Sequence, residues 1–183
     1  MEVVPTEIPG VLILRVPRFG DERGFFSEVF RDTWIPGLAF VQDNHSMSAA
    51  SGTVRGLHFQ VPPFAQDKLV RVARGAVYDV AVDIRRGSPS YGRHVGVVLS
   101  ERNWEQLLVP RGFAHGFCTL EPDTEVLYKV TAHYSQEHDR GIRWDDPALG
   151  IAWPVERAVL SDKDRTWPPL AELPEHFTYR GGA

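Results

Sequence analysis

The feature that most constrains this chain is a series of short segments with strand character, separated by glycine, proline and serine. Side chains within them alternate with a period of two, as at residues 78–84, which is typical of β-strands. The segments recur about every eight to twelve residues, a spacing that favours an antiparallel sandwich or small barrel over alternating strands and helices. Strands are predicted at residues 11–16, 24–30, 40–46, 54–60, 68–74, 77–84, 94–99, 105–109, 116–120 and 125–134.

Helical signals are scarce. Residues 31–35 and 161–172 can each form short helical pieces, which prolines interrupt. The segment from Asp145 onward is rich in proline and tryptophan, and it is predicted to pack against the barrel as an ordered extension. No internal repeat and no linker is evident, so residues 1–183 are predicted to form a single domain.

Charge and composition narrow the classes of function. The net charge of −4 argues against a nucleic-acid or anionic membrane surface, although 20 Lys and Arg allow a locally basic pocket. No apolar run approaches the roughly 20 residues that span a bilayer, and the N-terminus lacks a secretory signal. The one cysteine, Cys118, cannot form an internal disulfide. A cytoplasmic protein is therefore predicted.

Side chains that carry chemistry are concentrated in two neighbouring stretches. Residues 54–60 read Val-Arg-Gly-Leu-His-Phe-Gln, and residues 66–72 read Gln-Asp-Lys-Leu-Val-Arg-Val. Taken alone, His58 is typical of a half-buried strand histidine. Partners elsewhere in the chain are needed before it can be read as a catalyst.

Further motifs follow these two stretches in a fixed order. They are Asp-Val-Ala-Val-Asp-Ile-Arg at 79–85, Gly-Ser-Pro at 87–89, Gly-Phe-Ala-His-Gly-Phe at 112–117, Tyr-Lys at 128–129, Trp-Asp-Asp-Pro at 144–147 and Leu-Ser-Asp-Lys-Asp at 160–164. In this order the chain resembles the dTDP-4-dehydrorhamnose 3,5-epimerase family, over roughly residues 5 to 170. The resemblance implies an all-β fold, the double-stranded β-helix or cupin jelly roll, with a short C-terminal helical extension. It also implies a homodimer and no cofactor.

A metal-dependent cupin is the strongest competing interpretation. Metal cupins resemble this chain but bind the metal through a His-x-His motif, a later Glu and a final His. The residues at the four matching positions here are His58, Gln60, Lys68 and His115. An ammonium in place of the carboxylate would repel a divalent cation, and two imidazoles alone leave a zinc or iron site underfilled. We therefore predict that the chain holds no metal.

Epimerisation beside a ketone requires a base, a group that holds the enolate oxygen, and an acid on the opposite face. The resemblance implies that His58 is the base, since its ordinary pKa of about 6.5 lies near working pH. Lys68 would hold the enolate oxygen and Tyr128 would be the acid, unless Tyr128 is only a wall residue. Asp164 would orient His58, although Asp162 stays open as an alternative partner.

Other positions match substrate contacts of the family. His115 would be a hydrogen bonder on the substrate side, or else a core histidine. Tyr134 lies six residues after Tyr128, so a continuous strand would point both to the same face, as a wall or a supporting hydroxyl. Alternate polar positions of one strand can line a pocket, or simply face solvent: Gln42, Asn44 and Ser46.

The nucleotide end calls for cations and a flat apolar surface. Arg55 and Lys163 match family positions for phosphate contact. Residues 21–28 resemble a segment that reaches the site of the neighbouring subunit, where Arg23 would meet phosphate, Phe26 would pack on thymine and Glu28 would accept from a base N–H. Without the resemblance, this segment is an exposed turn and an edge strand.

The activity implied is epimerisation at C3 and C5 of dTDP-4-dehydro-6-deoxy-D-glucose, giving dTDP-4-dehydro-L-rhamnose. Two alternatives remain: an epimerase of C3 or C5 alone in an antibiotic-sugar pathway, and a cupin that only binds a nucleotide sugar. The presence of His58, Tyr128 and Asp164 together argues against a pure binder, which needs neither a base nor a proton donor.

Overall fold

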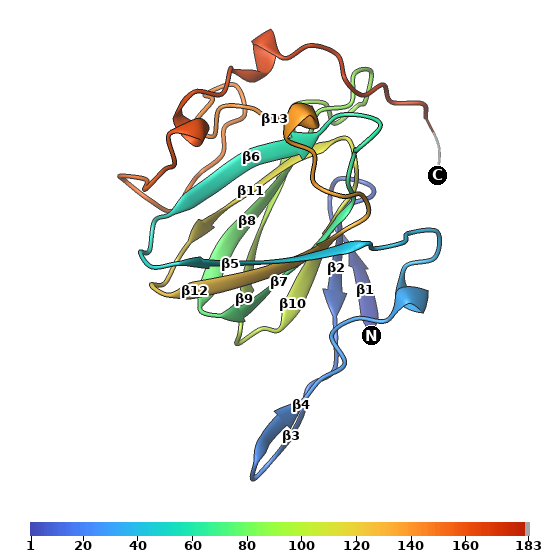
Figure 1. The fold of residues 1–183 in the computed structure, drawn as a ribbon, viewed down its shortest axis with the longest axis vertical. Helices are drawn as coiled ribbons and strands as arrows, with labels where there is room; N and C mark the ends of the chain where they lie inside the picture. The colour runs from blue at the N-terminus through green and yellow to red at the C-terminus, as the bar shows by residue number, and fades with distance from the viewer. Residues whose placement is uncertain (182–183) are drawn as a thin grey trace.

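Two antiparallel β-sheets packed face to face form the body of the protein, in a computed structural model that describes residues 1–181 (Figure 1). The six-stranded sheet has the order β1 (Glu2–Pro5), β2 (Leu12–Arg15), β10 (Glu105–Val109), β7 (Lys68–Arg74), β12 (Thr124–Val130) and β5 (Gln42–Ser48). The five-stranded sheet has the order β13 (Asp139–Gly141), β6 (Val54–Gln60), β11 (Phe113–Thr119), β8 (Ala76–Asp83) and β9 (His94–Ser100). From β5 to β13, successive strands alternate between the sheets except at the β8–β9 pair. This path confirms the predicted all-β jelly roll.

The period-two pattern decides which side chains face the core. Val70 and Val72 of β7 pack between the sheets, whereas Leu69 of the same strand lies on the outer face. Burying each such side chain stabilises the fold by about 1.5–3 kcal/mol. The apolar part of the core between the sheets consists of Val70, Val72, Val77, Ala81, Val95, Leu99, Leu107, Val109, Phe113, Phe117 and Val126.

Each sheet is also covered on its outer face. The C-terminal extension places Leu149, Leu170 and Leu173 against the five-stranded sheet. It contains the 3₁₀ helices η3 (Lys163–Arg165) and η4 (Leu170–Glu172), which confirms the predicted interrupted helical pieces. Two further 3₁₀ turns are η1 (Asp32–Trp34) and η2 (Gln136–His138). Among residues 1–181, no helix is long and apolar enough to cross a membrane.

Two predicted strands end four residues earlier than expected. The strand predicted at 125–134 ends at Val130, because that residue already faces the first residues of both neighbouring strands, Gln42 and Lys68. The strand predicted at 24–30 ends after three residues.

The shortened strand forms a separate hairpin of β3 (Phe19–Asp21) and β4 (Gly24–Phe26), which projects from the body (Figure 1). Its partner strand β3 is equally short, and their pairing stops at Phe19 and Phe26. The N-terminal strand β1, which we did not predict, pairs with β2.

An irregularity between β6 and β11 shapes the cavity between the sheets. His58 pairs with His115 but Arg55 pairs with Phe117, so β6 contains one residue more than its partner over this interval. The strands approach closely here: a Cβ added to Gly56, whose φ is +135°, would lie 2.6 Å from Cα of Gly116. The bulge reverses the alternation and brings Arg55 to the same side of the strand as His58.

Candidate active site

A cavity with two lobes lies between the diverging sheets, and three predicted catalytic side chains line both lobes: His58, Lys68 and Tyr128. The larger lobe, about 390 Å³, is called the Tyr134 lobe and is also lined by Gln42, Asn44, Phe59, Gln60, Gln66, Tyr134, Asp139 and Lys163. The smaller lobe, about 260 Å³, is called the Arg55 lobe and is also lined by Ser46, Arg55, His115, Phe117, Ser161 and Asp164. Strands of both sheets and the C-terminal extension therefore all contribute side chains to this cavity.

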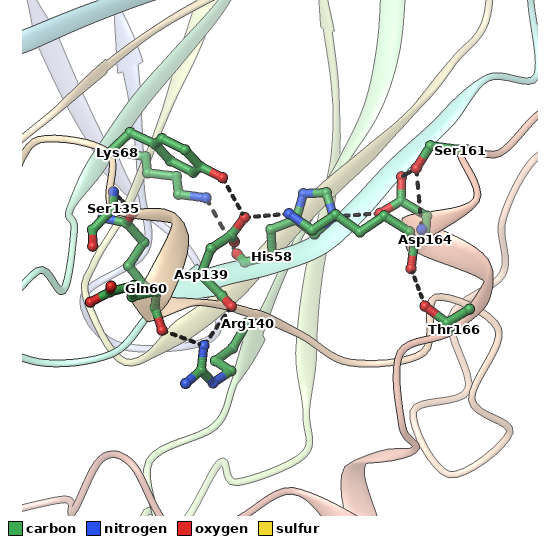
Figure 2. A network of polar contacts seen from close by, with 12 residues as sticks. His58, Gln60, Lys68, Ser135, Asp139, Arg140, Ser161, Asp164 and Thr166 are labelled. Atoms are coloured by element: carbon green, nitrogen blue, oxygen red, sulfur yellow. Dashed lines mark hydrogen bonds and ion pairs between the residues drawn. The ribbon is translucent and has the colours of Figure 1, made fainter.

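His58 is held by a carboxylate from the C-terminal extension. Its Nε2 forms a hydrogen bond with Asp164 on η3, and the Oγ of Ser161 donates to the other carboxylate oxygen at 2.9 Å (Figure 2). Burial alone would raise the pKa of Asp164. Hydrogen bonds from His58 and Ser161, with the charges of His58 and Lys163, outweigh burial and lower this pKa below its usual value. The carboxylate that contacts His58 is that of Asp164, and Asp162 only precedes the helical turn.

Lys68 and Tyr128 face His58 from the opposite sheet. Lys68 is buried, and its Nζ donates to the backbone carbonyl of His58 at 3.3 Å. Burial lowers the pKa of Lys68 to about 8, and the charges of Asp139 and Asp79 oppose that shift. Burial also raises the pKa of Tyr128, which keeps the phenol protonated at neutral pH.

His115 forms a second histidine–aspartate pair. Its Nε2 lies 2.9 Å from Oδ1 of Asp79, a wholly buried carboxylate on β8. The other oxygen of Asp79 has no hydrogen-bond partner among residues 1–181. His115 is therefore fixed by a neighbour and also lines the cavity, so both sequence interpretations describe part of its environment.

The family follows from comparison with known proteins. The model of the family described as dTDP-4-dehydrorhamnose 3,5-epimerase matches residues 5–172. This chain belongs to that family. A dTDP-4-dehydrorhamnose 3,5-epimerase of Sinorhizobium fredii is 59% identical over 177 residues, which cover 94% of this chain and 91% of the relative.

Solved structures of family members are also similar. A dTDP-6-deoxy-D-glucose-3,5-epimerase from Legionella pneumophila, in complex with dTDP-4-keto-L-rhamnose, is 41% identical with a TM-score of 0.93, covering 98% of this chain and 99% of that one. A dTDP-4-dehydrorhamnose 3,5-epimerase from Bacillus anthracis with TDP and PPi bound is 50% identical with a TM-score of 0.88, covering 92% of this chain and 98% of that one. The jelly roll is thus the fold of the family.

Two cations that the family resemblance assigns to phosphate lie in different lobes. The guanidinium of Arg55 donates to Ser48 Oγ and to the backbone carbonyl of Met47, both at 3.1 Å. Lys163 instead forms an ion pair with Asp139, across the mouth of the Tyr134 lobe. A substrate that contacts both cations has to extend past His58 from one lobe into the other.

The remaining predicted family positions divide into two groups. Gln42 and Asn44 line the Tyr134 lobe as expected, and Ser46 lines the Arg55 lobe. Tyr134 also lines the cavity, but the prediction that it lies on one strand with Tyr128 is wrong, because it follows the end of β12.

The hairpin residues do not reach the cavity of their own chain. Arg23 pairs with Asp21 and Glu28 with Arg31, while Phe26 is 71% exposed. None of the three predicted nucleotide contacts on this segment, Arg23, Phe26 and Glu28, lines either lobe.

Sequence reasoning missed three acidic or hydroxyl side chains of the site. Asp139, which we did not predict as a site residue, accepts hydrogen bonds from Tyr134 OH, at 3.2 Å, and from Lys163. Asp79 lies on the same inward face of its strand as the apolar residues Val77 and Ala81. An aspartate on such a face could have been used to predict a buried hydrogen-bond partner. The hydroxyl of Ser161 carried no signal of its own.

The metal-cupin counterparts have other contacts here. Both hydrogens of the Gln60 amide are directed at backbone carbonyls, and the Lys68 ammonium faces the His58 carbonyl. Within the part of the chain that the structure describes, no group of three or more His, Cys, Asp and Glu side chains lies together in a way that could hold a metal ion.

Proposed function

We propose that this protein epimerises dTDP-4-dehydro-6-deoxy-D-glucose at C3 and C5 to dTDP-4-dehydro-L-rhamnose, with His58 as the base. The observation that carries the proposal is the His58–Asp164 pair, which opens into a cavity shared with Lys68 and Tyr128. Family membership supports the reaction, and the geometry supports these roles for the residues.

Proton removal is the first step. A neutral His58 takes the proton from the carbon beside the C4 ketone, and the electrons of that C–H bond move to the ketone oxygen. The ammonium of Lys68 stabilises the enolate that forms, because a buried positive charge acts strongly at short range. Asp164 stabilises the imidazolium and fixes the tautomer of His58.

Proton return completes each epimerisation. Tyr128 lies on the sheet opposite His58, so its phenol can protonate the enolate carbon on the other face of the sugar ring. The C–H bond reforms with inverted configuration, and the proton on His58 then returns to the phenolate through solvent. Both C3 and C5 flank the same ketone, so one set of groups serves both carbons.

We further propose that the working unit is a homodimer in which the β3–β4 hairpin completes the neighbouring site. Two observations support this arrangement: Phe26 is exposed, and no residue of the hairpin lines either lobe of its own chain. The hairpin also projects from the body (Figure 1). Mixing a His58→Ala variant with a variant lacking Arg23 and Phe26 tests it. A mixed dimer would regain one intact site and therefore activity, whereas a hairpin that serves its own chain would give no recovery.

Solvent exchange tests the reaction itself. Wild-type protein incubated with substrate in deuterated water should place deuterium at both C3 and C5, read by NMR or mass spectrometry. Label at one carbon would contradict 3,5-epimerisation and support the single-carbon alternative. In the His58→Ala variant exchange should disappear, and unchanged exchange would overturn the role of His58. The cytoplasmic location stays a prediction.

A further inference from the structure

The segment after β12 contributes Tyr134 to the lining of the larger lobe and forms no strand. Residues 131–135 belong to no helix or strand, because both neighbours of β12 start opposite Val130. Tyr134 lies in this segment and is 57% exposed. Packing of the ring therefore does little to fix Tyr134, and its position depends on what holds the backbone.

Three glutamine side chains form hydrogen bonds with the backbone of this segment, to one group in each of the four consecutive residues 132–135. Gln66 Nε2 donates to the carbonyl of residue 132 at 2.8 Å, and Gln60 Nε2 donates to the carbonyl of residue 133 at 3.1 Å. In the opposite direction, the N–H of Tyr134 donates to Gln42 Oε1 at 3.0 Å, and the N–H of Ser135 donates to Gln60 Oε1 at 2.6 Å. We call Gln42, Gln60 and Gln66 the glutamine clamp.

The clamp joins the segment to both sheets. Gln42 begins β5 of the six-stranded sheet, Gln60 ends β6 of the five-stranded sheet, and Gln66 lies in the loop before β7. All three line the Tyr134 lobe. Gln60 is only 4% exposed, and its amide also donates to the carbonyl of Phe64 at 2.8 Å, so both its hydrogens and its oxygen are used within the chain.

From this position Tyr134 meets the charged groups at the mouth of its lobe. Its hydroxyl donates to Asp139 Oδ2 at 3.2 Å, and the same carboxylate oxygen pairs with Lys163. A shift of the 131–135 backbone would move the phenol away from this cluster. The clamp thus controls one wall of the lobe without itself taking part in proton transfer.

We infer that the glutamine clamp is a positioning device, which places Tyr134 at the mouth of the cavity and thereby sets the affinity for the part of the dTDP-sugar away from the reacting carbons. This inference rests on the proposed function and deepens it. The inference also explains why an amide stands at position 60, where metal cupins have a metal-binding histidine. Side chains that lock the groups touching a ligand in place are a general requirement of a tight site.

Two variants of different severity test the clamp. Gln66→Met removes one clamp contact, and Gln60→Met removes two clamp contacts and the one to Phe64. We expect KM and the Kd for dTDP, measured by calorimetry, to rise about threefold for Gln66→Met and about tenfold for Gln60→Met, with kcat changed less than about threefold. A fall in kcat with unchanged KM and Kd would overturn the inference.

A double-mutant cycle separates positioning from general stability. If Gln60 acts through Tyr134, adding Gln60→Met to Tyr134→Ala should change the Kd for dTDP by less than about twofold. Full additivity of the two substitutions would overturn the inference, because the amide would then act by another route.

A matched control is available outside the cavity. Asn103 accepts from the N–H groups of Ser100 and Glu105 and donates to the carbonyl of Val98, so its amide holds backbone in the same way. Asn103→Ala should lower thermal stability but leave KM and the Kd for dTDP within about twofold of wild type. An equal rise in both constants would show that any loss of stability produces the effect.

The measurements also distinguish this inference from the proposed function. Wild-type protein that binds dTDP but shows no exchange at C3 or C5 would overturn the proposed reaction, while the dTDP affinities of the clamp variants would still decide the inference. Wild-type protein that exchanges both carbons, with clamp variants that bind dTDP like wild type, would overturn the clamp alone. Absence of both binding and exchange would overturn both.

Discussion

Two histidine–aspartate pairs lie close together in this molecule and are built differently. His115 and Asp79 come from adjacent strands of one sheet, and both side chains are buried. His58 takes its carboxylate from Asp164, 106 residues away on the C-terminal extension, and its side chain is 29% exposed.

The different origin of the two aspartates affects how rigidly each histidine is held and how open it is to the cavity. A pair within one sheet is fixed by strand register, which suits a group that holds a constant hydrogen bond. A pair delivered by a separate element leaves the face of the histidine open to the cavity, which proton transfer to a substrate carbon requires. We therefore expect the two pairs to respond unequally to the same substitutions.

The largest contrast should appear when each histidine is replaced. His58→Asn should lower kcat about 10³-fold, because general-base catalysis contributes roughly 10²–10⁴-fold. His115→Asn should lower kcat only about tenfold, as expected if one hydrogen bond to the substrate is lost. Steady-state kinetics, with deuterium exchange as a second readout, measures both. Equal losses in kcat would contradict the distinction between the pairs.

The aspartates should follow the same order with smaller effects. Asp164→Asn keeps the shape of the side chain but removes the charge that stabilises imidazolium, so we expect kcat to fall about 10²-fold. Asp79→Asn should lower kcat less than about tenfold. The variants are compared at saturating substrate after thermal unfolding shows that both fold. A greater loss in Asp79→Asn would reverse the assignment.

Docking of the extension can be disturbed without touching a titrating group. A Cβ on Gly141 would lie 2.5 Å from the indole of Trp167, a ring that also lies edge-on 6.2 Å from the His58 ring. Gly141→Ala should therefore displace the extension, lower the free energy of unfolding by about 1–3 kcal/mol, and lower kcat about tenfold. Unfolding curves and kcat check the expectation. Unchanged kcat in a destabilised variant would show that the His58–Asp164 pair does not depend on this contact.

The smallest expected effect is a change in pH dependence. Lys68 has a pKa of about 8, and the proposed enolate stabilisation needs its cationic form, so activity should fall as pH rises through about 8. The charge of Asp79 raises this pKa, so Asp79→Asn should move the alkaline limb of kcat/KM to lower pH. Asp164→Asn should leave the limb in place. A limb that moves equally in both variants would contradict the link between Asp79 and Lys68.

Local pattern was sufficient to predict much of the fold and part of the site. The period-two pattern predicted the strand at residues 68–74 that the structure contains as β7, and the family motifs pointed to the pairing of His58 with Asp164. The pairing itself spans 106 residues, so no periodicity could reveal it. Family order, rather than strand pattern, carried that prediction.

Features that depend on two elements at once were not predictable. Strict alternation would place Arg55 and His58, three residues apart, on opposite faces, and only the bulge against β11 brings them together. The end of β12 depends on where its two neighbours begin, so Tyr134 could not be assigned to a loop from its own sequence. Asp139 became part of the site only because Lys163 and Tyr134 fold over it.

The origin of Asp164 in the extension has a consequence for how the molecule matures. During synthesis, every strand of both sheets has been made by Gly141, the end of β13, while the carboxylate that orients His58 has not. The nascent chain at that stage contains Lys68 and Tyr128 but lacks the partner of the base. Under the proposed mechanism, the full rate of proton transfer is therefore expected only after the final segment docks, and a protease that cuts between β13 and η3 and releases that segment would return the mature molecule to this earlier state.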